Sequence, residues 1–193
     1  MKTLQHPWLK LQIRTALVLG LTDVARRQLD ALLKLAPGDA YALASRGHLL
    51  AQSGQRRAAV ADYQALTEQR PQQASAWFNL GFLLEQENEL DAAETAFRRA
   101  LAIEADLDRA WYGLGLTLIR LKRFDEAVAA LRRNTELQPM SPFGWYQLAR
   151  VHVDRAQPEE AVKIIRHLQG FEPKVAAQLV RETGLVVQTA LSK

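Results

Sequence analysis

Small and apolar residues recur along this chain in two stripes at helical spacing. Within residues 74–107 the first stripe is Trp77, Leu80, Gly81 and Leu84, and the second is Ala93, Phe97 and Ala100. Side chains three and four positions apart lie on the same face of an α-helix. Each stripe therefore predicts one helix, and the two together predict a helix–turn–helix repeat.

The same repeat returns every 34 residues. The alanines that keep this interval are Ala25, Ala59, Ala93, Ala127 and Ala161, and the prolines are Pro37, Pro71, Pro139 and Pro173, with Ala105 in the remaining place. A fixed period of this length is typical of a solenoid, in which each repeat buries its apolar stripes against its neighbours. We predict one domain of five repeats, 6–39, 40–73, 74–107, 108–141 and 142–175. Residues 176–193 are expected to form a capping helix, broken or bent near Gly184, and a tail with a short helix over 185–191.

Small and helix-breaking residues indicate how each repeat is built. Glycine at repeat position 8 (Gly47, Gly81 and Gly115) allows two helices to approach closely. The turn between the two helices is predicted at the residues that follow the first stripe, namely Gly20, Gly54, Asn88, Lys122 and Ala156. Acidic residues open the second helices, where we expect them to cap free amides and to complement the helix dipole: Asp23, Asp91, Asp125 and Glu159.

These positions resemble the tetratricopeptide repeat: Trp, Leu, Gly and an apolar residue at 4, 7, 8 and 11, then Ala, an aromatic residue, Ala and Pro at 20, 24, 27 and 32. The resemblance covers residues 6–175 and is closest in 74–107 and 108–141. The first repeat departs most, so its first helix is expected to be shifted or frayed. The resemblance implies an all-α, right-handed superhelical solenoid whose first helices line a concave groove for a peptide or partner protein. Members of this family are mostly scaffolds or adaptors and seldom catalytic.

If that geometry holds, aromatic side chains line the groove. Phe78, Tyr112 and Tyr146 share repeat position 5, and Phe82, Tyr41 and Phe143 stand beside them. An exposed apolar strip of this kind usually marks a binding surface. The alternative is that the position 5 aromatics pack between first helices and cover the core.

Polar residues surround the expected strip: Arg14, His48, Asn79, Arg109, Arg120, Gln147 and Arg150. Arginines around an aromatic floor would suit a peptide with acidic and apolar side chains, although each could equally be a solvated surface residue. Asn79 and Arg109 also resemble part of the carboxylate clamp that some family members use for chaperone tails. Ala44, His48 and Gly113 stand where the rest of that clamp is required, so a chaperone-tail clamp is not expected.

Composition narrows the classes of function. With no cysteine, the chain has no disulfide, thiolate metal site or cysteine nucleophile. No apolar run reaches the length of a membrane span, and Lys10 and Arg14 interrupt any signal-like segment, so we predict a cytoplasmic protein. The net charge of +4 is spread over nearly every repeat and indicates no particular partner.

Catalysis, metal binding and a cofactor are not predicted. The four histidines, His6, His48, His152 and His167, occupy different repeat positions and therefore different helix faces. His152 falls on a core stripe and is expected to be a buried packing residue. The glycines are explained by helix packing and turns, without a phosphate-binding loop.

Two other functions stay open. Helical repeats can bind RNA, and arginine pairs such as Arg98-Arg99 and Arg132-Arg133 recur, although mostly on the second helices, away from the groove. Self-association is the other: the groove would hold the tail of a second copy through Leu185-Val186-Val187.

Overall fold

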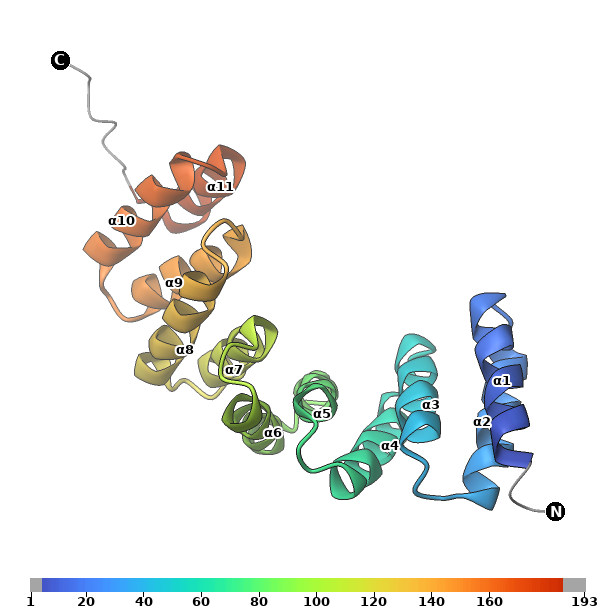
Figure 1. Ribbon diagram of the computed structural model, residues 1–193. Helices are drawn as coiled ribbons and strands as arrows, with labels where there is room; N and C mark the ends of the chain where they lie inside the picture. Colours follow the sequence, from blue (N-terminus) through green and yellow to red (C-terminus); the bar gives the residue numbers. More distant parts are fainter. Residues whose placement is uncertain (1–4, 186–193) are drawn as a thin grey trace. The chain divides into compact units, whose positions relative to one another are not determined.

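The computed structural model describes residues 5–185, with side chains from Pro7 onward. Contacts between Cα atoms divide the chain into two compact units, Met1–Ile103 and Glu104–Lys193, called here the N-terminal and C-terminal units. Each described segment is an α-helix or a short turn, as the apolar stripes predict (Figure 1). The protein is all-α, and each unit is a row of helices joined by short turns.

The helices begin at positions that repeat along the chain. The N-terminal unit contains α1 (Gln5–Val18), α2 (Thr22–Leu35), α3 (Ala40–Gln52), α4 (Arg56–Gln69), α5 (Ala74–Gln86) and α6 (Leu90–Ile103). The C-terminal unit contains α7 (Asp108–Arg120), α8 (Phe124–Leu137), α9 (Pro142–Asp154), α10 (Pro158–Gln169) and α11 (Pro173–Thr183). Because α1 ends at the repeat position where α3 and α5 end, the expected shift of the first helix is wrong.

In the pairs α3–α4, α5–α6 and α7–α8, a glycine of the first helix faces a large side chain of the second. A Cβ added at Gly81 would lie 3.0 Å from the Phe97 ring, and one at Gly115 would lie 2.7 Å from Cγ of Leu131. Both facing side chains are buried, so neither can move aside cheaply. The predicted role of these glycines in close helix packing is confirmed.

The turns inside the pairs share one backbone conformation. Gly20, Gly54, Asn88, Lys122 and Ala156 all have positive φ, from 55° to 77°. Glycine adopts this left-handed conformation freely, whereas a Cβ makes it unfavourable. The predicted turns are confirmed, including those at Lys122 and Ala156, where the residue type itself gives little indication of a turn.

Replacing Ala156 by glycine is expected to raise the free energy of unfolding by about 1 kcal/mol, because the substitution relieves a left-handed alanine at φ 55°. The matched control is Ala129→Gly on the exposed side of α8, which should lower stability by about 1 kcal/mol. Urea unfolding followed by circular dichroism measures both. Equal losses in the two variants would contradict the assignment of strain to Ala156.

The acidic residues that open the second helices do not cap them. The N-cap residues of α2, α8 and α10 are Leu21, Arg123 and Gln157, and none makes a side-chain capping hydrogen bond. Asp23, Asp125 and Glu159 lie inside the first turn instead, where a negative charge stabilises the helix through its dipole. The capping prediction is therefore wrong for these helices, while the dipole argument fits their positions. Asp39 does cap α3, accepting a hydrogen bond from the Ala42 amide at 3.0 Å.

The C-terminal unit ends on a helix that packs against α9 and α10. Helix α11 stops at Gly184, which is left-handed at φ 69° and whose amide donates to the Val180 carbonyl. The predicted capping helix and its break at Gly184 are confirmed. The short helix expected over 185–191 lies almost entirely outside the described residues.

Candidate functional site

Three tryptophans hold the first helices against the turns that precede them. The indole Nε1 of Trp77 donates to the Pro71 carbonyl at 3.0 Å, that of Trp111 to Ala105 at 2.8 Å, and that of Trp145 to Pro139 at 2.9 Å. Each bond spans six residues, and the accepting residues occupy the repeat position of the prolines. The indoles thus serve as both packing groups and donors, a role that the apolar stripe alone does not indicate.

In the N-terminal unit, two phenylalanines of α5 stack on each other. Phe78 and Phe82 have ring centroids 6.4 Å apart, and Phe78 also contacts the buried Phe97 at 6.1 Å. Phe78 is half-buried, whereas Phe82 is 48% exposed. Both predicted uses of such aromatics therefore occur side by side: Phe78 covers the core, and Phe82 faces solvent.

The polar residues predicted to bind a ligand in this unit differ in their exposure and in the hydrogen bonds that they already make. Asn79 Nδ2 donates to the Tyr63 hydroxyl at 3.4 Å and is half-buried, so its first partner is internal. Burial raises the pKa of the Tyr63 hydroxyl, which keeps it neutral. Tyr41 is half-buried with Lys10 Nζ 5.9 Å from its ring centroid, and His48 is exposed. Of these groups, His48 is the one that projects into solvent.

In the C-terminal unit, Tyr146 and Arg150 of α9 hold a carboxylate of α11. The Tyr146 hydroxyl donates to Glu182 Oε2 at 2.6 Å, and Arg150 Nη1 lies 3.4 Å from the same oxygen. Arg150 also stacks over the Tyr146 ring at 5.9 Å. The predicted site residues Tyr146 and Arg150 are thus brought together around Glu182, which sequence reasoning missed.

The hydroxyl of Tyr146 holds the pKa of Glu182 below its ordinary value, with Gln178 and Arg150 acting in the same direction. A carboxyl of lowered pKa stabilises the fold above its unfolded pKa and loses that contribution as pH falls through its folded pKa. We expect the contact between α9 and α11 to weaken in that acidic window.

Tyr146→Phe should therefore raise the pKa of Glu182 toward its ordinary value, because the strongest donor to its carboxylate is removed. Carboxyl-carbon NMR titration of the side chain measures the change. Tyr112→Phe on α7 is the matched control and should leave Glu182 unchanged. A Glu182 titration that is identical in Tyr146→Phe and the native chain would remove the hydroxyl as the cause.

The remaining candidates of the C-terminal unit lie on α7 and α9, which contact each other. Tyr112 and Gln147 are half-buried, Arg109 is exposed, and Phe143 is 69% exposed at the start of α9. The exposed Met140 stands in the turn before Phe143. This surface combines an apolar edge with the Tyr146 and Arg150 pair.

Sequence reasoning also missed an ion triad around one buried carboxylate in the N-terminal unit. Arg46 of α3 donates twice to Asp62 of α4, at 2.6 and 2.8 Å, and once to Asp30 of α2 at 2.8 Å. Asp62 is buried, and its hydrogen bonds raise the pKa of Arg46 further above its ordinary value. The sequence does carry one indication of this triad: Arg46 occupies repeat position 7, where later repeats have Leu80, Leu114 and Leu148.

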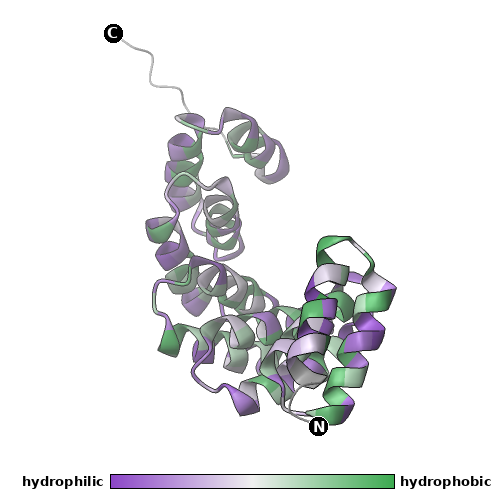
Figure 2. Ribbon diagram, turned by 45° about the vertical axis from the view of Figure 1, so that its right-hand side comes forward, coloured by the Kyte–Doolittle hydropathy of each residue, from purple (hydrophilic) through white to green (hydrophobic). Residues whose placement is uncertain are grey.

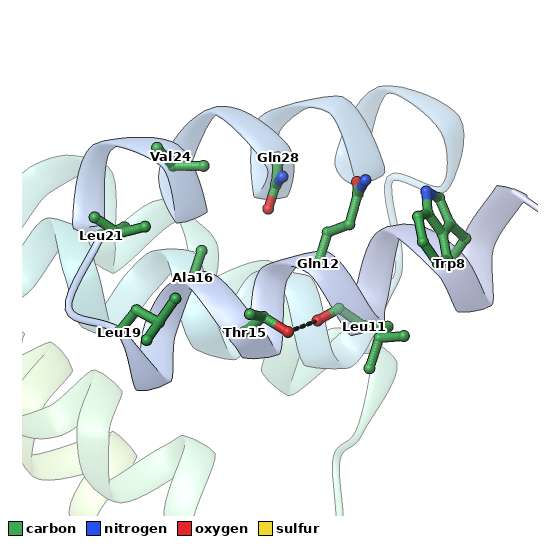
Figure 3. A pocket seen from close by; sticks show the side chains of 9 residues that line it. All are labelled: Trp8, Leu11, Gln12, Thr15, Ala16, Leu19, Leu21, Val24 and Gln28. Carbon is green, nitrogen blue, oxygen red and sulfur yellow. Dashed lines mark hydrogen bonds between the residues drawn. The ribbon is translucent and has the colours of Figure 1, made fainter.

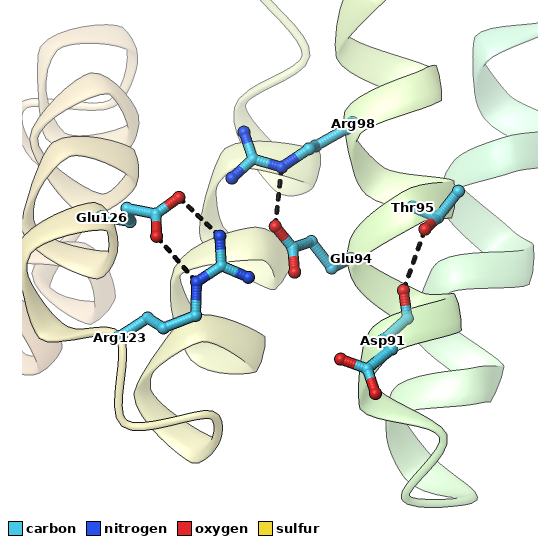
Figure 4. A network of polar contacts seen from close by, with 6 residues as sticks. All are labelled: Asp91, Glu94, Thr95, Arg98, Arg123 and Glu126. Carbon is cyan, nitrogen blue, oxygen red and sulfur yellow. Dashed lines mark hydrogen bonds and ion pairs between the residues drawn. The ribbon is translucent and has the colours of Figure 1, made fainter.

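Several arginines on the second helices and in the adjoining turns have acidic partners. On α6, Arg98 Nε donates to Glu94 at 2.8 Å, and before α8 Arg123 makes two bonds of 2.7 Å to Glu126 (Figure 4). Arg133 pairs with Glu136 at 2.9 Å, and Arg155 pairs with Asp125. Exposed pairs of this kind add little stability, but they reduce the positive potential of the surface that bears them.

The histidine on the core stripe is a packing residue, as predicted. His152 is buried, and its Nδ1 lies 2.9 Å from Oε1 of Gln157. Across residues 5–185, no group of three or more acidic or histidine side chains is placed to hold a metal ion. Over the same residues, no helix has both the length and the apolar character to span a bilayer.

Models of known protein families match the sequence of these paired helices. The family model described as "Tetratricopeptide repeat" matches residues 11–55 and 45–108, which together exceed half of the chain. The chain belongs to the tetratricopeptide repeat family. A second model, described as "Anaphase-promoting complex, cyclosome, subunit 3", matches residues 86–168.

Several solved structures share the fold of this tetratricopeptide repeat protein. A crystal structure of MamA is 23% identical with a TM-score of 0.79, and it covers 84% of this chain and 95% of its own. MamA 41-end from Desulfovibrio magneticus RS-1 is 20% identical with a TM-score of 0.81, covering 88% and 96%. YrrB, whose title reads "a TPR protein with an unusual peptide-binding site", is 16% identical with a TM-score of 0.80, covering 88% of both chains. Among curated proteins, none matches the sequence significantly.

Proposed function

We propose that this tetratricopeptide repeat protein is a non-catalytic scaffold or adaptor that binds a peptide or partner protein on the surface of its first helices. Support comes from the family, since such repeats serve mostly in protein interaction, and from the peptide-binding site named for YrrB. The observation that carries the proposal is the set of exposed aromatics on first helices, Phe82 in one unit and Phe143 in the other.

Within the predicted set we propose a division between residues that contact the ligand and residues that support them. Phe82, Tyr112 and Phe143 can lose their rings without opening the core, because each is exposed or half-buried. Phe78 rests on Phe97, and Tyr146 is bonded to Glu182. We therefore assign ligand contact to the first three and positioning to Phe78 and Tyr146.

The chemistry of the ligand follows from the groups beside these rings. Arg150 is exposed and places its positive charge beside the Tyr146 ring, so the first-helix surface of the C-terminal unit suits an acidic side chain. Exposed Phe143 and Met140 offer apolar contact next to it. A peptide that alternates acidic and apolar side chains fits this surface.

RNA is the weaker alternative. An RNA-binding surface needs unpaired basic groups in a continuous track, because affinity for phosphates depends on clustered charge. The arginines at 98, 123, 133 and 155 have acidic partners instead. These pairs favour the peptide proposal.

The test begins with peptides selected from a random display library on the intact chain, whose affinities are then measured by fluorescence anisotropy. The variant Phe82→Ala, Tyr112→Ala, Phe143→Ala should bind at least about 30-fold more weakly, the loss of one interface hot spot. Circular dichroism checks that its helicity is unchanged.

The matched control carries Arg98→Ala and Arg132→Ala on the second helices. Peptide affinity should survive these substitutions, and its dependence on salt should be the same in the control as in the native chain. Loss of binding in the control but not in the aromatic variant would overturn the assignment to the first helices. Binding of RNA with a steep salt dependence, lost in the control, would establish the alternative.

A further inference from the structure

Two exposed surfaces of the chain differ in what they offer a ligand. Trp8, Leu11 and Leu19 line a hollow on the α1–α2 hairpin, and none of the described residues around it is charged (Figure 3). In the C-terminal unit, hydrophilic and hydrophobic residues lie side by side along the helices (Figure 2). The exposed face of α9 combines Phe143 with Arg150. A ligand for α9 is therefore selected by charge as well as by apolar contact.

The positive group of this face is only partly used. Arg150 contacts the Tyr146 hydroxyl and Glu182 through Nη1 alone, at 3.3 and 3.4 Å, which are long distances for hydrogen bonds from a charged group. Within residues 5–185, its Nε and Nη2 atoms donate to no protein acceptor. A guanidinium can hold a carboxylate through two parallel N–H bonds. Arg150 therefore retains the capacity to bind a second carboxylate.

The carboxylate of Glu182 makes its short contacts elsewhere. Its Oε2 accepts from the Tyr146 hydroxyl at 2.6 Å, and its Oε1 accepts from Nε2 of Gln178 at 2.7 Å. Tyr146 and Arg150 both lie on α9, whereas Glu182 and Gln178 lie on α11. Glu182 thus occupies, from within the chain, the place where the carboxylate of a ligand would meet Tyr146 and Arg150.

Glu182 can leave this place without opening the core. It lies in the last turn of α11, while the buried residues of that helix, Ala176 and Leu179, belong to the turns before it. The Glu182 side chain is 34% exposed and that of Arg150 is 50% exposed. Exposed ion pairs contribute little to stability, and the ends of helices open readily. Breaking the contact therefore costs little.

The charged and apolar groups of this surface share one side of α9. Phe143, Tyr146 and Arg150 are separated by three and then four residues, a spacing that places them on the same helix face. The rise from Phe143 to Arg150 is about 10 Å, which is the length of about three residues of extended peptide. A ligand with an acidic side chain about three residues from an apolar one can reach both ends of this face.

We propose that Glu182 is an internal competitor for the ligand: an acidic side chain of the bound peptide displaces it from Arg150 and Tyr146. This competition, which rests on the proposed peptide function, makes α11 a regulator of the first-helix surface. While Glu182 is in place, Tyr146 supports α9. Once Glu182 has left, the Tyr146 hydroxyl donates to the carboxylate of the ligand. Peptides without an acidic side chain leave the contact closed.

The first test compares affinities for a glutamate-containing peptide, selected by display on the Glu182→Ala chain and measured by fluorescence anisotropy. Glu182→Ala should bind it about fivefold more tightly than the native chain, the fold-change that corresponds to an exposed ion pair of about 1 kcal/mol. The gain should disappear when glutamine replaces the peptide's glutamate, or when Arg150→Ala is added.

Glu136→Ala is the matched control. It removes the same charge from an exposed pair, that with Arg133 on α8, and should leave the affinity of the native chain unchanged. Equal affinities in Glu182→Ala and the native chain would overturn the proposal. So would a gain that persists when Arg150→Ala is combined with Glu182→Ala, because the displaced carboxylate would then not be competing for Arg150.

A second measurement follows the displacement itself and needs no selected peptide. The carboxyl-carbon NMR signal of Glu182 is recorded at neutral pH while hexaglutamate is added, with sodium chloride at equal ionic strength as the control. The signal should shift in the native chain and stay in place in Arg150→Ala. If the library yields no binder while this signal shifts, the peptide function fails and the displacement stands. A Glu182 signal that hexaglutamate leaves unchanged overturns the displacement.

Discussion

Replacing Arg46 by leucine is expected to lower the free energy of unfolding by about 3–5 kcal/mol, because it leaves a buried carboxylate without its cation. Arg46 links α3 to Asp62 and Asp30 through three hydrogen bonds of 2.6–2.8 Å. Its removal leaves the Asp62 carboxylate buried without a cation. Urea unfolding at neutral pH, monitored by circular dichroism, measures the loss.

The matched control uses residues that the chain itself provides. In the repeat of residues 74–107, the positions of Arg46 and Asp62 are occupied by Leu80 and Ala96, both buried. Arg46→Leu with Asp62→Ala should therefore recover most of the lost stability, since an apolar pair replaces the ion pair without leaving a charge behind. A double variant no more stable than Arg46→Leu would show that the loss has another origin.

Replacing Phe97 by alanine is expected to cost about 3–5 kcal/mol, because a fully buried ring is removed and the cavity beside Gly81 cannot close. The substitution should also weaken peptide binding at the surface of the first helices. Phe78 rests on the Phe97 ring with centroids 6.1 Å apart, so a side chain of the first-helix surface loses its support. Unfolding in urea gives the first effect, and the affinity of a selected peptide gives the second.

Phe97→Leu is the control for this site. Leucine already occupies the equivalent position in the next repeat, where Leu131 packs against Gly115. The change should cost much less than Phe97→Ala and should largely preserve peptide affinity. If the two substitutions destabilise equally, the size of the group facing Gly81 does not determine the packing of α5 on α6.

Much of the fold could be predicted from the sequence, because the repeat displays each structural constraint several times. One left-handed alanine is hard to predict alone, but Ala156 follows Gly20 and Gly54 at the same interval, and its φ of 55° agrees with theirs. The close approach at Gly81 and Gly115 could be read in the same way. The capping prediction was wrong because the sequence shows an acidic residue near a helix start but not which residue precedes the first turn.

The candidate site could be predicted less well, because its residues depend on contacts between repeats. Position 5 identified Tyr146, but its bond to Glu182 involves a helix from outside the five predicted repeats. Exposure varies even within one helix, since Phe78 covers the core while Phe82 faces solvent. The exposure of Trp8 and Leu11 was not foreseen, because they lie in the repeat that departs most from the family pattern.

The ion triad also determines which helices can be neighbours. A chain of similar repeats can pair one repeat out of place during folding, since most apolar contacts are interchangeable. Arg46 is not interchangeable: one repeat further on, Ala96 would replace Asp62 as its partner, and on the other side Gln64 would replace Asp30. A misaligned chain would leave a half-buried guanidinium without a carboxylate. Arg46 is therefore fully paired only when α3 lies between α2 and α4.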